Sequence, residues 1–160
     1  MSYWQLFYHI VWATKNREPI LTPQVEAVIH GFLQNKALGL EATVHALDGY
    51  LDHVHMVVSI PPKIAVSKFV GQVKAVASVR YNQANPQAEP FYWQEEFGVF
   101  SFDRKRLPNF VAYVQRQKYH HAQNNLIPVL ERDLVEEILH EPPSVYGVAD
   151  AKWWCEMLEA

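Results

Sequence analysis

The chain has 160 residues, 49% of them hydrophobic, and a formal net charge of −3. This length fits one domain with a proper core, and the apolar fraction excludes an intrinsically disordered chain. No apolar run reaches the ~18 residues that a membrane span needs, and the N-terminus lacks a signal-peptide pattern. The single cysteine, Cys155, excludes an internal disulfide framework. We therefore expect a cytoplasmic protein that has no membrane partner.

Charge is distributed unevenly along the chain. Residues 126–160 contain only two of the basic residues but eight of the acidic ones. An acidic tail therefore follows a mildly basic body. We expect one domain over residues 1–125 and an acidic C-terminal extension over residues 126–160.

The hydrophobic pattern predicts, in chain order, a strand, a helix, two strands, a helix, a short strand and a helix. These elements are expected at residues 5–13, 23–39, 41–49, 53–60, 65–82, 98–102 and 103–124. In the second strand, Ala42, Val44 and Ala46 are expected on one face because side chains alternate along a strand. Residues 130–139 are compatible with one more short helix.

This order of elements is typical of an α+β fold, in which a ferredoxin-like antiparallel sheet has helices on one face. The last helix and the acidic tail are additions to that plan. We expect these helices to leave the other face of the sheet uncovered, and this face carries the residues described next.

A histidine pair in the third strand is the most informative feature of the sequence. His53 and His55 flank Val54, so both imidazoles point to the same face while Val54 points to the opposite, apolar layer. Two adjacent imidazoles form half of a site for a divalent metal ion, although histidines on strands also serve purely structural roles.

The last predicted helix adds a second set of polar side chains. Tyr113, Gln117 and His121 are spaced at i, i+4 and i+8, so they lie along one stripe. The phenol and the amide oxygen are therefore candidates for a nucleophile and a third metal ligand. Tyr119 is a rival nucleophile, but it lies off this stripe.

Four segments resemble, in order, a known family. They are residues 8–15 (YHIVWATK), 52–58 (DHVHMVV), 93–101 (WQEEFGVFS) and 113–121 (YVQRQKYHH). Together they are similar to the single-tyrosine HUH transposases of the insertion-sequence-200-like type, including relatives associated with repetitive extragenic palindromes. The resemblance covers about three quarters of the chain, from Tyr8 to His121.

The resemblance implies a role for each matched residue. His53, His55 and Gln117 would bind Mg²⁺ or Mn²⁺, and Tyr113 would be the nucleophile. The activity implied is cleavage and rejoining of single-stranded DNA near hairpins through a 5′-phosphotyrosine, by a homodimer. His121 is a further candidate ligand, and Asp52 is a candidate hydrogen-bond partner of a ligand or a turn cap.

Contacts with DNA are expected from basic side chains that could meet phosphates. The candidates are Lys15, Arg17, Lys68, Lys74, Arg80, Arg104, Lys105 and Arg116. Tyr92 and Trp93 are either core residues or platforms for unpaired bases. The net negative charge of the chain departs from the positive charge that we expect of a DNA-binding protein.

Two other functions compete with the transposase interpretation. One is a domesticated protein that binds DNA hairpins without cutting them. The other is an unrelated metal-dependent phosphohydrolase in which water, rather than Tyr113, attacks the phosphate.

Overall fold

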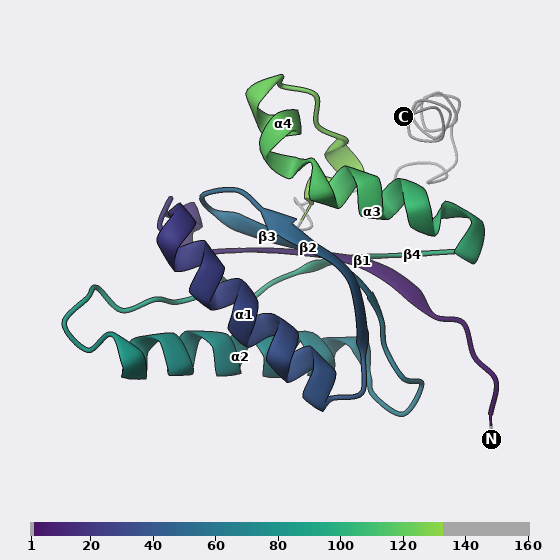
Figure 1. The fold of residues 1–160 in the computed structure, drawn as a ribbon, viewed down its shortest axis with the longest axis horizontal. Coiled ribbons are helices and arrows are strands. Elements are labelled where there is room, and N and C mark those ends of the chain that lie inside the picture. Colours follow the sequence, from purple (N-terminus) through teal and green to yellow (C-terminus); the bar gives the residue numbers. More distant parts are fainter. Residues whose placement is uncertain (1, 133–160) are drawn as a thin grey trace, which may run out of the picture.

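A computed structural model describes residues 2–132 of the chain (Figure 1). Most of the acidic extension, including nearly all of the predicted helix over residues 130–139, lies outside the described residues. The longer elements are β1 (Phe7–Ala13), α1 (Pro23–Gly39), β2 (Thr43–Gly49), β3 (His53–Ser59), α2 (Val66–Ala84), β4 (Gly98–Phe102), α3 (Leu107–Gln115) and α4 (Gln117–Ala122). Three short 3-10 helices cover Lys15–Arg17, Arg104–Arg106 and Pro128–Glu131.

The sheet has the order β2-β3-β1-β4, and all of its neighbouring strands are antiparallel. This confirms the predicted α+β fold with an antiparallel sheet. Figure 1 shows α1 and α2 against one face of the sheet and α3 against the other. The face that we expected to be open is therefore covered by the C-terminal helices.

Two apolar clusters, one on each face, hold these layers together. The larger cluster joins α1 and α2 to strand residues that include Trp12, Val54 and Met56. The smaller one joins Val57 to Phe110 and Leu130. Because both faces are covered and β3 has a neighbour on each edge, every residue of β3 is buried. Polar side chains on β3 must therefore find their partners inside the protein.

A β-bulge in β2 contradicts the predicted alternation of its apolar residues. The pairing of β2 with β3 shifts between Val44 and Ala46, so the two side chains no longer share a face. Val44 packs against the larger cluster and Ala46 belongs to the smaller one. The expectation that both face the same layer was wrong because a bulge inserts one residue.

The helix predicted over residues 103–124 is also divided. After the 3-10 turn at Arg104–Arg106, α3 ends at Gln115 and α4 begins at Gln117. Between them, Arg116 leaves the helical region with φ −107° and ψ 21°. No proline or glycine marks this break in the sequence. Among residues 2–132, no helix combines the length and apolar character that crossing a bilayer requires.

Candidate active site

The structure places His53 and His55 on the same face of β3, with their ring centroids 5.0 Å apart. Both side chains are buried beneath the C-terminal helices. Val54 packs into the opposite layer, as the alternation of the strand predicts.

Each histidine is held by a hydrogen bond at Nδ1. The Asp52 carboxylate lies 2.7 Å from Nδ1 of His53. His9, on the neighbouring strand β1, places its Nε2 atom 2.8 Å from Nδ1 of His55. These contacts fix the orientation of both rings and leave the Nε2 atoms facing the site, which is the usual arrangement around metal-binding histidines.

Both Nε2 atoms meet the carboxylate of Glu131. One oxygen of this residue, Oε2, lies 3.3 Å from Nε2 of His53 and 3.0 Å from Nε2 of His55. Glu131 is the last residue of the 3-10 turn after α4, and Leu130 beside it is buried in the smaller cluster. Burial of Leu130 therefore places the adjacent carboxylate against the histidines.

The phenol of Tyr113 enters the same group from α3. Its hydroxyl donates a 2.6 Å hydrogen bond to Oε1 of Glu131 and accepts one of 3.0 Å from the backbone N–H of Ile127. A single carboxylate thus contacts the candidate nucleophile and both histidines, all within one chain.

Burial and ion pairing alter the pKa values of these groups. Burial alone would lower the pKa of His53, but hydrogen bonds with Asp52 and Glu131 outweigh it and raise the value to about 9. Burial dominates at His55 and lowers its pKa. Burial and the nearby Glu131 carboxylate both raise the pKa of Tyr113. Burial would raise the pKa of Glu131, but hydrogen bonds from both histidines hold it well below its usual range.

Two further candidates lie on α4: Gln117, whose Nε2 is 3.5 Å from the Tyr113 carbonyl, and His121, which contacts His53. The Gln117 side chain is buried, and within residues 2–132 its Oε1 atom has no hydrogen-bond partner. Nε2 of His121 lies 3.1 Å from Nε2 of His53, and its ring stacks on Tyr50. Lys118 ties the same helix to the rest of the domain through ion pairs with Glu26 and Asp48.

These residues fit a divalent metal ion. The ligand atoms of His53, His55 and Glu131 all lie within 4.8 Å of one another. The amide oxygen of Gln117, on α4, is buried without a hydrogen-bond partner among the described residues, and such an atom is costly to bury unless something binds it. Two imidazoles and a carboxylate are a donor set that proteins use to hold a divalent ion at an open, catalytic site.

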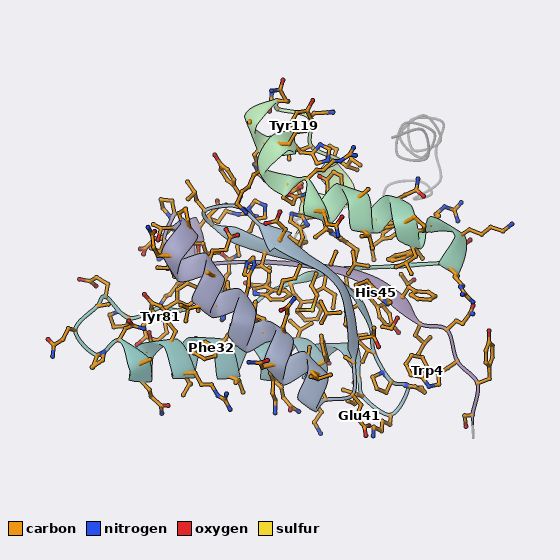
Figure 2. The ribbon with its side chains drawn as sticks, viewed as in Figure 1. Trp4, Phe32, Glu41, His45, Tyr81 and Tyr119 are labelled. Carbon is orange, nitrogen blue, oxygen red and sulfur yellow. The ribbon has the colours of Figure 1, made fainter. Side chains whose placement is uncertain are left out.

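The sequence pattern does not identify two residues of this site, Glu131 and His9, as functional. Glu131 is one of eight acidic residues in the segment assigned to the extension, and no spacing distinguishes it. His9 lies within a matched segment, but its contact with His55 depends on strand pairing. The rival Tyr119 is 60% exposed on α4 (Figure 2), and its ring contacts His120 rather than the histidine pair.

Most of the basic residues proposed to meet DNA are exposed, but Lys74 is not. Its side chain is 7% exposed, and its ammonium group donates hydrogen bonds to the backbone carbonyls of Gln94, Glu95 and Glu96. The expectation that Lys74 contacts DNA was wrong because these carbonyls hold its charge inside the fold. Trp93 also packs there, donating from Nε1 to the Lys74 carbonyl, whereas Tyr92 is exposed.

Comparison with known proteins gives a family match. The model for "Transposase IS200 like" proteins matches residues 2–117. The chain is 30% identical to the ISDra2 transposase TnpA of Deinococcus radiodurans over 90 residues. This alignment covers 56% of this chain and 64% of that protein. The chain is 30% identical over 76 residues to the transposase for insertion sequence element IS200 of Salmonella typhimurium, covering 48% of this chain and 50% of that protein. The matches thus span less than two thirds of these relatives.

Two solved structures share the fold. A crystal structure from Deinococcus radiodurans, of a protein described as a transposase, superposes with a TM-score of 0.58 at 21% identity. The similarity covers 78% of this chain and 95% of that one. A REP-associated tyrosine transposase bound to a REP hairpin gives a TM-score of 0.55 at 14% identity, over 79% of this chain and 76% of that one.

Proposed function

Since the chain belongs to the family of IS200-like transposases, we propose that it cleaves and rejoins single-stranded DNA near hairpins through Tyr113. The observation that carries this proposal is the Glu131 carboxylate, which contacts Tyr113 and both histidines of one chain. A nucleophile and a candidate metal site therefore lie next to each other.

The chemistry requires Tyr113 to give up a proton and attack a phosphorus atom. The phenol oxygen forms a bond to phosphorus, and the bond from phosphorus to the 3′ oxygen breaks. This leaves a 5′-phosphotyrosine and a 3′ hydroxyl group, which takes its proton from solvent. The covalent bond preserves the energy of the phosphodiester, so the reverse reaction can rejoin strands.

Two neighbours of Tyr113 prepare it for this step. The N–H of Ile127 points at the phenol oxygen and stabilises negative charge that develops there. Glu131 accepts the phenol hydrogen bond and so is placed to take the proton. Because a carboxylic acid is far more acidic than a phenol, we expect this transfer to accompany attack rather than precede it.

We propose that His53, His55 and Glu131 hold Mg²⁺ or Mn²⁺, with Gln117 and His121 as additional ligands. A divalent ion bound there supplies Lewis-acid polarisation of a phosphate oxygen. Asp52 and His9 orient the ligand rings through their Nδ1 atoms.

The proposal also includes DNA as the substrate and a homodimer as the assembly. The relative bound to a REP hairpin supports DNA as the partner. Exposed Lys15, Arg17, Lys68, Arg80, Arg104, Lys105 and Arg116 are candidates for contacts with its backbone. We also propose a cytoplasmic homodimer with a catalytic domain over residues 1–125, to which Glu131 of the following segment contributes.

The test is to incubate the folded protein with hairpin oligonucleotides that carry single-stranded flanks, together with Mg²⁺ or Mn²⁺. We expect a covalent adduct that survives denaturation and is absent with Tyr113→Phe. Hairpin binding by wild type without an adduct would instead favour a binding protein. Cleavage that persists in Tyr113→Phe would favour a hydrolase that uses water.

A further inference from the structure

Tyr50, which has no role in the chemistry proposed above, stacks on His121, one of the proposed additional ligands. Tyr50, in the turn between β2 and β3, stacks on His121 of α4 with ring centroids 4.2 Å apart and planes inclined by 4°. The rings of Tyr50 and His121 lie 6.4 Å and 4.8 Å from the His53 ring. The pair thus extends outward from one of the proposed ligands.

Tyr50 is held in place by the backbone and is still open to solvent. Its N–H donates to the carbonyl of His53, and a side chain at Gly49 would collide with that carbonyl, so this turn brings two chain segments close together. The Tyr50 side chain nevertheless remains 37% exposed, and Leu51 beside it is equally exposed. A fixed aromatic ring that faces solvent is ready to stack on another flat group.

A positive charge lies on the same edge of the domain. The guanidinium group of Arg17 lies 3.6 Å from the Asp52 carboxylate that orients His53. Backbone hydrogen bonds from Thr14 and Leu21 to the Asp52 and Leu51 carbonyls fix the intervening connection against the β2–β3 turn. Aromatic rings and basic groups along one edge are typical of sites for single-stranded nucleic acid, whose bases stack while its phosphates meet cations.

From this arrangement we propose that Tyr50, backed by His121, is the stacking platform for one unpaired base next to the phosphate that is cut. This inference rests on the proposed function and adds a residue that positions the substrate. The platform selects an unpaired base because a base within a duplex has no free face to offer. It would also hold the phosphate of that nucleotide beside His53.

The experiment compares Tyr50→Ala with Tyr50→Phe, which keeps the ring, and with Tyr3→Ala. Tyr3 is 86% exposed and serves as a matched control, because it belongs to the N-terminal segment, whose end Figure 1 shows away from α4. A hairpin is first selected by wild-type binding from a pool with randomised flanks. It is then made with 2-aminopurine, a fluorescent base, at each flanking position in turn.

For one flanking position, we expect wild type, Tyr50→Phe and Tyr3→Ala to quench the fluorescence on binding. Tyr50→Ala should lose the quenching and bind the hairpin about 5- to 150-fold more weakly, the usual cost of removing one stacking ring. Its affinity for Mn²⁺ should match that of wild type.

Three results would overturn the platform. Equal binding and quenching by Tyr50→Ala would show that no base stacks there. Parallel losses of DNA and Mn²⁺ binding would show that Tyr50 acts only by holding His121. Failure of wild type to select any hairpin would overturn the proposed function, and the platform with it.

Discussion

Replacing His9 with phenylalanine should weaken metal binding without touching any proposed ligand. In the structure, Nε2 of His9 lies 2.8 Å from Nδ1 of His55, and both side chains are buried. When His55 binds a metal through Nε2, its Nδ1 atom carries the proton and donates a hydrogen bond to Nε2 of His9. Phenylalanine fills a similar volume beside Phe110, whose ring lies 6.0 Å away, but it accepts no hydrogen bond.

The magnitude follows from the loss of that single contact. Removing the partner of a metal-binding histidine typically weakens metal affinity by about 10- to 100-fold. Isothermal titration with Mn²⁺ measures the change, and thermal unfolding checks that the variant folds. His9→Gln, whose amide oxygen reaches nearly the position of Nε2, should recover most of the affinity. Unchanged Mn²⁺ affinity in His9→Phe would refute the reasoning.

Three further outcomes follow from the same geometry. Lys74→Met should lower the free energy of unfolding in urea by about 1–3 kcal/mol, because the carbonyls of residues 94–96 lose their buried donor; an unchanged midpoint would contradict this. Glu131→Gln should weaken Mn²⁺ binding more than Gln117→Ala does, because a carboxylate contributes charge as well as an oxygen, and titration calorimetry should rank the two variants in that order. The pKa of His53 is raised to about 9 in the folded protein from an ordinary 6.5, so its contribution to stability is complete below pH 6.5 and is lost as the pH rises through 9. Metal-free protein should therefore become easier to unfold across this window, and Mn²⁺ binding near pH 7.5 should release close to one proton, measurable by calorimetry in buffers of different ionisation enthalpy; binding without proton release would count against a charged His53.

The parts of the site that follow from local periodicity could be predicted from the sequence. Alternation along β3 places His53 and His55 on one face, and the helical repeat places Tyr113 one turn before Gln117. Both histidines do share one face of β3, and Gln117 still lies next to Tyr113, with its Nε2 atom 3.5 Å from the Tyr113 carbonyl, although the helix breaks at Arg116 between them.

Features that depend on tertiary contacts could not be predicted. The burial of Lys74 depends on three carbonyls that lie about twenty residues further along the chain. Ala46 faces the opposite side of the sheet from Val44 because of a bulge that the composition of β2 does not reveal. Glu131 reaches the histidines only because Leu130 packs into the smaller cluster. In each case the deciding partner is remote in sequence.

The central claim is that Tyr113 attacks DNA beside a metal held by His53 and His55. Its most direct test is mass spectrometry of proteolysed protein after reaction with the selected hairpin and Mn²⁺. The account predicts a nucleotide attached through a 5′ phosphate to the peptide that contains Tyr113, and no adduct with His53→Ala. An adduct on another residue, or none from folded and metal-loaded wild type on a hairpin that it binds, would contradict the account.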